Sequence, residues 1–232
     1  GVDLVALDPH TLELLTTINV ETGTSTNMAT GLALSPDGST IAVVASDFQG
    51  QGPNDSAMAY FYNADTLALL GSVDLLVKKE SMMQEIRRVV FTSNTTAVVS
   101  ARLHAVLYSI DLANSFALTS LSHDGPTNGA NIGQLTIGPN GALWATLHRN
   151  GGFLHFPADA MSSTKLAAGT FVSDFGDTDS ISFAPSGAKA FIAARASTNV
   201  TVVDPAAPTV ALDTFSAGNT SRRGHYGTST PY

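Results

Sequence analysis

The sequence predicts an all-β protein built from repeated four-stranded units, and its turn-rich composition is the first observation behind this prediction. Of the 19 acidic residues in the 232-residue chain, 15 are Asp and only four are Glu, and the chain has 20 Gly and 10 Pro. Asp, Gly and Pro favour turns, whereas Glu favours helices. The second and third observations are a recurring strand-and-turn motif and its regular spacing.

The motif is a short alternating strand that ends in a tight turn, and it occurs four times. Pro presets such a turn, and an Asp-Gly or Asn-Gly pair tolerates positive φ. Ser93 and Pro139 are 46 residues apart, as are Pro139 and Pro185. Pro36 and Ser93 are 57 residues apart, which indicates an insertion of about 11 residues in the first unit. The copies are Leu32–Gly38, Val89–Asn94, Leu135–Gly141 and Ile181–Gly187.

A second strand follows each turn, and a pair formed by a third and a fourth strand occurs five times. The second strands are Ile41–Ala45, Ala97–Ala101, Leu143–Leu147 and Ala190–Ala194. The third strands begin at Leu4, Ala59, Val106, Phe153 and Val200. Four short strands in about 40–50 residues are typical of one blade of a β-propeller. We therefore predict an all-β β-propeller of four-stranded antiparallel blades, with about four and a half blades in residues 1–216 and a polar tail or linker at 217–232.

Two stretches of the repeat carry a family resemblance. Residues Phe191–Pro205 resemble the repeat of YVTN-type propellers, and Ser35–Gly38 is also typical of these proteins. The resemblance covers residues 1 to about 216 and extends to lactonase-like propellers. It implies a ring of seven blades, which is more than this chain supplies. Either blades are missing from the sequence or another chain completes the ring.

Composition and charge exclude several classes of function. The formal net charge is −8 with only 13% charged residues, which argues against nucleic acid as a partner because phosphate binding needs a basic surface. Cysteine is absent, so the chain has no disulfide, no Cys-ligated zinc and no thiol nucleophile. No run of 18 apolar residues predicts a membrane span. The chain starts at Gly1 without Met or a signal peptide, which suggests a processed or truncated protein, and we expect an extracellular, periplasmic or cell-surface location.

Charged residues gather in the loops that precede the first strands and follow the second strands, which open on one side of a propeller. We call this side the loop face. Five of the seven Arg are placed there, and both insertions, 48–55 and the candidate short helix 77–85, fall there too. An Arg cluster suits a carboxylate or phosphate, so one interpretation is a small anionic ligand. The favoured interpretation is that these residues pair between blades. The candidate binding residues are Glu85, Arg87, Arg102, His104, His148, Arg149, Asp177, Asp179 and Arg195.

A metal site finds little support. Gluconolactonase-like propellers place an acid or Asn just before each first strand, and the resemblance maps these positions to Thr30, Arg87, Gly133 and Asp179. Only Asp179 could ligate a cation, and Arg87 would repel it. Two residues earlier, Glu85, Asn131 and Asp177 could offer oxygen ligands. We expect neither a metal nor another cofactor.

Two functions remain. The first is a non-catalytic binding or assembly module, because no catalytic set stands beside the strong architectural repeat. Its partner would be another protein or another copy at the open blade edges, since unpaired strand edges recruit other chains. We expect the flanks near Gly1 and Ala217 to be covered, either by residues of this protein that the sequence lacks or by a neighbouring subunit. The alternative is a lactonase-type hydrolase or isomerase for a carboxylated substrate. It would use Arg102, His148, Arg195 and Glu85.

Overall fold

In the computed structural model of the protein, every extended element of the described chain is a β-strand, apart from a 3₁₀ residue at Ala158. No helix in this part of the chain has the length and apolar character needed to cross a membrane. The predicted helix at 77–85 and the insertion at 48–55 lie outside the described residues, as does most of the predicted tail. The structure describes residues 2–20, 28–46, 57–75, 86–101, 105–126, 130–149, 151–158, 168–195 and 197–217.

The strands form one two-stranded and four four-stranded antiparallel sheets, which succeed one another along the chain. We call them the half-blade and blades I to IV. The half-blade consists of β1 (Val2–Leu7) and β2 (Leu14–Val20). Blade I consists of β3 (Met28–Leu34), β4 (Thr40–Ser46), β5 (Ala57–Asn63) and β6 (Leu69–Asp74), and blade II of β7 (Ile86–Phe91), β8 (Thr96–Ala101), β9 (Leu107–Asp111) and β10 (Ala117–Leu121). Blade III consists of β11 (Asn131–Ile137), β12 (Leu143–His148), β13 (Gly152–Phe156) and β14 (Thr170–Ser173), and blade IV of β15 (Thr178–Phe183), β16 (Ala190–Ala194), β17 (Asn199–Asp204) and β18 (Ala207–Ser216).

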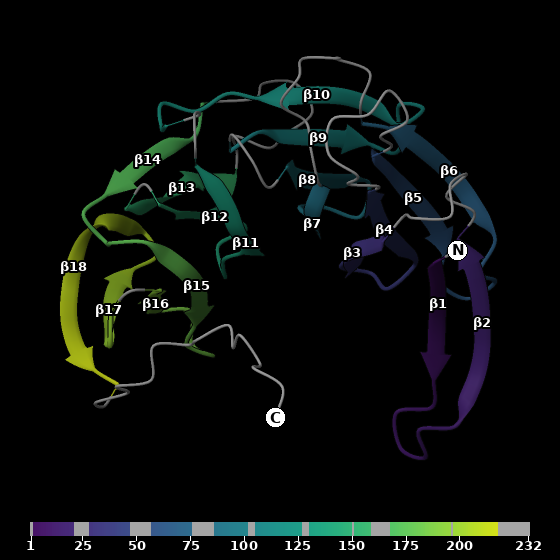
Figure 1. The fold of residues 1–232 in the computed structure, drawn as a ribbon, viewed down its shortest axis with the longest axis horizontal. Helices are drawn as coiled ribbons and strands as arrows, with labels where there is room; N and C mark the ends of the chain where they lie inside the picture. Colours follow the sequence, from purple (N-terminus) through teal and green to yellow (C-terminus); the bar gives the residue numbers. More distant parts are fainter. Residues whose placement is uncertain are drawn as a thin grey trace, which may run out of the picture.

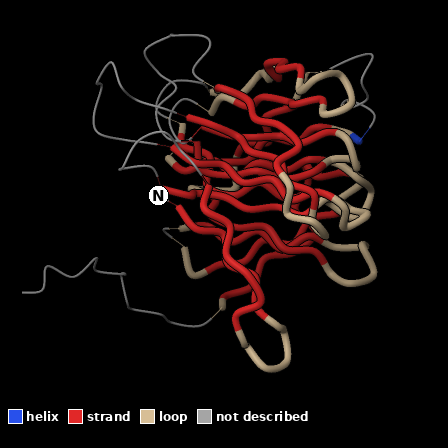
Figure 2. The backbone as a smooth tube through the Cα atoms, turned by 90° about the vertical axis from the view of Figure 1, so that its right-hand side faces the viewer, coloured by secondary structure: helices blue, strands red, loops and turns tan. Residues whose placement is uncertain are grey.

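This order confirms the repeat read from the sequence. The four first-and-second strand pairs and the five third-and-fourth pairs all form where the motif predicts them. The blades stand side by side in an open arc, with β3, β7, β11 and β15 on its inner side and the fourth strands outside (Figure 1). Seen from the side, the strands run roughly parallel to one another through the layer, and the turns project at its edges (Figure 2). The ring is incomplete: the arc is open between the half-blade and blade IV.

The turn glycines of the motif adopt the conformation that the sequence predicts. Gly38, Gly141 and Gly187 have φ values of 74°, 80° and 74°. Only glycine enters this left-handed region freely, so each turn can reverse the chain within a few residues. Blade II has no glycine at this point. Its Asn94 instead accepts a hydrogen bond from the backbone N–H of Asp37 at 3.1 Å, which joins the turns of blades I and II.

The hydrophobic core lies between the blades, because each sheet presents apolar side chains on both of its faces. Blade I packs on blade II through Phe61 and Phe91, whose ring centroids lie 6.4 Å apart. Blade II packs on blade III around Leu135 and Leu143, and blade III packs on blade IV around Trp144. Since successive strand residues alternate between faces, this two-sided burial explains why the second strands are almost continuously apolar.

His155, in the interface between blades III and IV, gives the fold a pH dependence. Its ring meets Trp144 edge-on at 4.9 Å, and burial lowers the pKa of His155 below its ordinary value of 6.5. The unfolded chain therefore takes up the proton more readily than the folded one, so stability is complete above that value and declines as the pH falls below it. Thermal unfolding midpoints measured from about pH 8 down to pH 5 should fall, and His155→Phe should flatten the fall.

A matched control separates this effect from the other histidines. His10 lies exposed in the turn between β1 and β2. His10→Gln should leave the pH profile as it is in the wild type, and an unchanged profile in His155→Phe would contradict the assignment.

Candidate functional site

Each inner strand of the four-stranded blades has a β-bulge near its start, at the loop face. The antiparallel register shifts between Ala29 and Gly31 in β3, and between Ile86 and Arg88 in β7. It also shifts between Ile132 and Leu135 in β11, and between Thr178 and Ser180 in β15. A bulge redirects the side chain of its extra residue. The bulged positions include Thr30, Arg87, Gly133 and Asp179, the same four that the gluconolactonase-like resemblance maps to a cation site.

These positions do not assemble a cation site in the described chain. Thr30 offers one hydroxyl, Gly133 has no side chain, and the side chain of Arg87 lies outside the described residues. Nowhere among the described residues do three or more His, Asp or Glu gather closely enough to hold a metal ion. Of the four bulge positions, Asp179 alone carries an acidic side chain, and its carboxylate lies close to the imidazole of His148.

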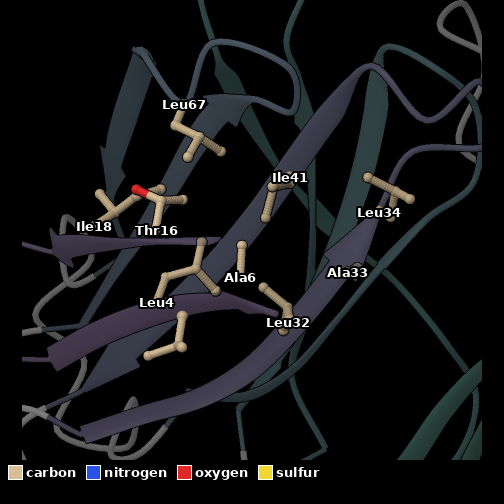
Figure 3. Close-up of a pocket in the computed structure, with 10 residues that line it drawn as sticks. Leu4, Ala6, Thr16, Ile18, Leu32, Ala33, Leu34, Ile41 and Leu67 are labelled. Atoms are coloured by element: carbon tan, nitrogen blue, oxygen red, sulfur yellow. The ribbon is translucent and has the colours of Figure 1, made fainter. Parts of the chain in front are cut away.

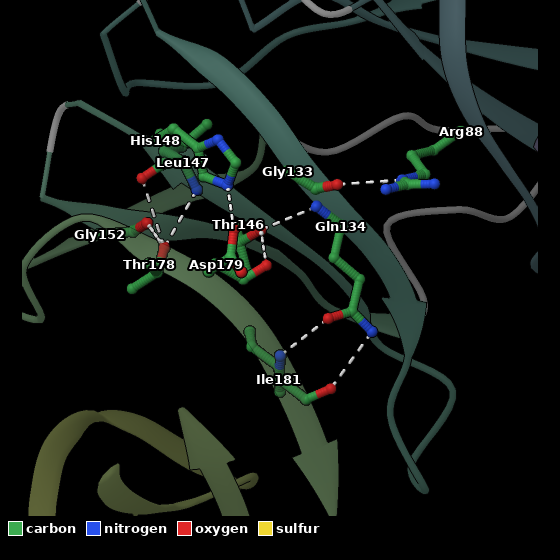
Figure 4. A network of polar contacts seen from close by, with 10 residues as sticks. All are labelled: Arg88, Gly133, Gln134, Thr146, Leu147, His148, Gly152, Thr178, Asp179 and Ile181. Carbon is green, nitrogen blue, oxygen red and sulfur yellow. Dashed lines mark hydrogen bonds and ion pairs between the residues drawn. The ribbon is translucent and has the colours of Figure 1, made fainter. Parts of the chain in front are cut away.

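His148 and Asp179 form a close pair on the loop face (Figure 4). His148 ends β12 in blade III, Asp179 is the bulge residue of β15 in blade IV, and Nε2 of the imidazole lies 2.7 Å from Oδ1 of the carboxylate. The histidine side chain is 18% exposed and the aspartate side chain 55% exposed. The two groups lack the alignment of a hydrogen bond, since Nε2 of His148 has no hydrogen-bond partner among the described residues. The pair therefore bridges two blades by proximity and, when the imidazole is protonated, by charge.

Glycine at position 133 makes the place of His148 possible. A Cβ atom built on Gly133 would lie 2.3 Å from Nε2 of His148 and 2.8 Å from Oγ1 of Thr146. Both distances are shorter than atoms tolerate, so any larger residue at 133 would displace the imidazole. Gly133 occupies one of the four positions mapped to a cation ligand, but it has no side chain that could bind one. The space that its missing side chain leaves is taken by the imidazole of His148 on the neighbouring strand.

Uncharged side chains complete the contact between blades III and IV (Figure 4). The Gln134 amide accepts from the N–H of Ile181 at 2.9 Å and donates to the carbonyl of Ile181 at 3.3 Å. Thr146 accepts from the N–H of Gln134 at 2.8 Å and donates to the carbonyl of Asp179 at 3.2 Å. The fully buried Thr178 accepts from the N–H of Leu147 at 3.1 Å and also contacts the carbonyl of Gly152. These contacts fix the inner strands of the two blades in one register.

The same end of the arc carries polar bridges at the other two boundaries between four-stranded blades. Arg88 of blade II donates from Nε to the carbonyl of Gly133 in blade III at 3.0 Å. Thr30 of blade I donates from its hydroxyl to the carbonyl of Ile86 in blade II. A polar side chain beside each bulge therefore reaches the next blade, and at one boundary that side chain is an arginine.

The structure brings together some of the candidate residues named from the sequence. The side chains of His148 and Asp179 are in contact. Arg149, the residue after His148 in the chain, has a positive φ of 75°. The backbone N–H of Arg195 donates to the carbonyl of Asp177 at 2.6 Å, which places the loop after β16 beside the start of β15. Glu85, Arg102 and His104 lie outside the described residues, so the predicted cluster of Arg102, His148, Arg195 and Glu85 stays a prediction.

Sequence reasoning missed the uncharged part of this network. Gln134, Thr146 and Thr178 carry hydrogen bonds between blades III and IV, yet none was a candidate. The available signal was their position: Gln134 and Thr178 flank the bulges, and Thr146 lies on the strand opposite Gly133. A polar residue in an otherwise apolar inner or second strand needs a partner, and the next blade is where one lies.

Comparison with solved structures bears on the architecture. The chain aligns with the periplasmic gluconolactonase PpgL of Pseudomonas aeruginosa at a TM-score of 0.67 and 13% identity, covering 94% of this chain and 65% of that one. It aligns with the dihydro-heme d1 dehydrogenase NirN at 0.67 and 14% identity, covering 92% and 41%. A putative 6-phosphogluconolactonase of Bacteroides uniformis aligns at 0.57 and 15% identity, covering 82% and 57%.

The fold is a β-propeller. This agrees with the radial four-stranded blades and with the repeat in the sequence. No protein-family model matches the chain, and no curated protein sequence matches it significantly. The chain spans about two-fifths to two-thirds of the length of these solved structures. At such low identity the likeness concerns the fold alone.

Proposed function

We propose that the protein is a non-catalytic binding or assembly module of the propeller type. One observation carries this proposal: two charged side chains of the loop face, those of His148 and Arg88, reach the neighbouring blade. His148 contacts Asp179 across the boundary of blades III and IV, and Arg88 contacts Gly133 across the boundary of blades II and III. These contacts occupy the groups as blade-to-blade bridges, whereas a catalytic set would converge on one cavity.

The loop face still offers charge to a ligand. The side chain of Arg195 is exposed there, on a protein with a formal net charge of −8. Guanidinium groups bind carboxylate and phosphate in a planar, forked geometry, so the ligand class that suits this face is a small anion or an acidic segment. The absence of cysteine and the periplasmic description of PpgL, one of the aligned proteins, support a location outside the cytoplasm.

Calorimetric titration with gluconate, glucono-lactone and other carboxylated sugars tests the proposal. We expect an anion to bind without turnover and Arg195→Ala to weaken its binding about threefold to tenfold, because one charge-assisted contact at an exposed site is lost. The thermal unfolding midpoint of this variant should stay that of the wild type, since the side chain is exposed. Lys189→Ala is the matched control, because Lys189 is an exposed cation at the opposite end of the same blade.

A lactonase-type hydrolase is the second candidate, and two observations favour it. The His148–Asp179 pair places an imidazole beside a carboxylate, and two of the aligned proteins are described as a gluconolactonase and a putative 6-phosphogluconolactonase. In the described chain the imidazole and the carboxylate are close but are not aligned as a hydrogen-bonded pair. If the protein hydrolysed these lactones faster than their spontaneous rate, and Asp179→Asn abolished that activity, the enzyme would be the correct assignment and the binding module would not.

The anion site has its own decisive outcome. An unchanged binding constant in Arg195→Ala would refute the proposed anion site.

A further inference from the structure

An apolar cleft of about 320 Å³ lies between β1 and blade I (Figure 3). Leu4, Leu32 and Leu34 are among the residues that line it. In a complete propeller further strands of the half-blade cover such a surface, so this cleft belongs to the fold.

The loop face has a different feature, a pair of buried polar atoms. Oδ1 of Asn131 and Nε2 of His148 are both closed to water and have no hydrogen-bond partner among the described residues. Burial has removed the hydration of these atoms, so each needs a donor or a cation in its place.

Asn131 and His148 stand opposite each other at the loop-face end of blade III. They pair between β11 and β12, next to the pair of Ile132 with Leu147. Directly opposed residues of an antiparallel pair present their side chains on the same face of the sheet, with Cβ atoms about 5 Å apart. Because Ile132 and Leu147 pack toward blade II, the side chains of Asn131 and His148 face blade IV.

The architecture itself does not require a polar residue at position 131. Asn131 is 9% exposed and therefore almost fully buried. The residue that takes the same place in blade I is Met28, which pairs with Ser46. A buried asparagine with an unpaired amide oxygen is thus a particular feature of blade III.

The imidazole of His148 lies against a carboxylate of the next blade. Its Nε2 is 2.7 Å from Oδ1 of Asp179, but the two atoms lack the alignment of a hydrogen bond (Figure 4). Without a hydrogen between them, the two lone-pair atoms repel each other at this distance. A metal ion accepts both lone pairs, and two adjacent ligands of one ion lie about 3 Å apart.

Space and access at this point also suit an ion. A Cβ atom at Gly133 would lie 2.3 Å from Nε2 of His148, so any side chain at 133 would crowd this point. The side chains of His148 and Asp179 are 18% and 55% exposed, so water can reach the carboxylate. Water can therefore complete a coordination shell.

The donor atoms determine the class of cation. They are one imidazole nitrogen, one carboxylate oxygen and one amide oxygen, since only two groups of the His, Asp or Glu kind meet here in the described chain. Ca²⁺ and Mg²⁺ prefer oxygen ligands alone, whereas imidazole together with oxygen suits Zn²⁺, Co²⁺ or Ni²⁺.

This donor set differs from the four positions that the gluconolactonase-like resemblance maps to a cation. Of those four, only Asp179 takes part. The imidazole comes from a second strand, and it lies where Gly133 leaves room. Asn131 and His148 belong to blade III and Asp179 to blade IV, so an ion held by them would join two blades.

We propose that Asn131, His148 and Asp179 bind a divalent first-row transition-metal ion through Oδ1, Nε2 and the carboxylate, with water completing the coordination shell. The ion cross-links blades III and IV. This inference goes beyond the proposed binding module, which needs no metal ion.

Calorimetric titration of the chelator-treated protein with Zn²⁺ tests the proposal, and the visible absorption of added Co²⁺ reports on the ligands. Zn²⁺ should raise the thermal unfolding midpoint, and Ca²⁺ and Mg²⁺ should not. His148→Gln and Asp179→Asn should each weaken Zn²⁺ binding about tenfold or more, because each variant loses a ligand. His10→Gln is the matched control, since His10 is exposed in a turn of the half-blade, and it should bind as the wild type does.

Asn131→Asp gives a result that a folding defect cannot produce. A second carboxylate should tighten Zn²⁺ binding about tenfold, whereas without metal the buried carboxylate should lower the thermal unfolding midpoint. Zn²⁺ should therefore raise the midpoint more in Asn131→Asp than in the wild type. Asn131→Leu, which has no donor atom, should bind Zn²⁺ more weakly than the wild type.

Two results would overturn the proposal. One is the absence of saturable Zn²⁺ binding by the wild type, which would leave a proton as the only cation between His148 and Asp179. The other is Zn²⁺ binding that His148→Gln and Asp179→Asn leave unchanged. Arg195→Ala should bind Zn²⁺ at least as tightly as the wild type, and gluconate titration of the chelator-treated protein reports on the anion site alone. Failure of the metal site and failure of the anion site are therefore separate outcomes.

Discussion

Trp144→Ala should lower the free energy of unfolding by about 3–5 kcal/mol, the largest loss we expect from a single substitution in this chain. Trp144 is fully buried in β12. Its ring stacks on Phe153 at 4.9 Å within blade III and meets Phe183 of blade IV edge-on at 5.6 Å. Truncation would therefore open a cavity at a blade boundary and remove contacts from both blades at once.

The loss should be measured by urea unfolding followed by circular dichroism, because Trp144 is the only tryptophan and its fluorescence disappears with it. Trp144→Phe keeps an aromatic ring in the site and should lose clearly less. A loss below about 1 kcal/mol in Trp144→Ala would mean that blades III and IV do not depend on this ring for their contact.

The fold could be predicted from the sequence because it depends on local signals that recur. Pro139 and Pro185 mark equivalent turns 46 residues apart, and each turn is followed by a nearly continuous apolar strand. Turn residues determine where the chain reverses. A strand that is buried on both faces is recognised by its continuous run of apolar residues, whichever strands it pairs with. The strand count of four and a half blades followed from the same signals and is confirmed.

The candidate site was less predictable because its contacts join residues far apart in the chain. Their charge made His148 and Asp179 candidates, and the structure brings the two side chains together. The neighbouring contact between Leu147 and Thr178 likewise joins residues 31 positions apart in the chain. Gln134 has no charge and no motif, so only its position in an inner strand hinted at a partner, and its bonds to Ile181 came from the structure. The bulges, which redirect these side chains, depend on the register between strands and leave no mark in composition.

Thr178→Val should lower the free energy of unfolding by about 1–3 kcal/mol, although valine has nearly the shape of threonine. The hydroxyl of Thr178 accepts from the N–H of Leu147 and contacts the carbonyl of Gly152, both in blade III. Valine would leave these backbone groups without their partner in a site that is closed to water, since Thr178 is fully buried.

Thr178→Ser separates the hydroxyl from the methyl group. Serine keeps the hydrogen-bonding oxygen and removes only a methyl, so it should be more stable than the valine variant. Amide hydrogen exchange gives a local readout, because the N–H of Leu147 should exchange faster in Thr178→Val and near the wild-type rate in Thr178→Ser. If valine were as stable as serine and the Leu147 amide stayed protected, packing alone would hold blades III and IV together. The polar contacts at the loop face would then be free to serve a ligand.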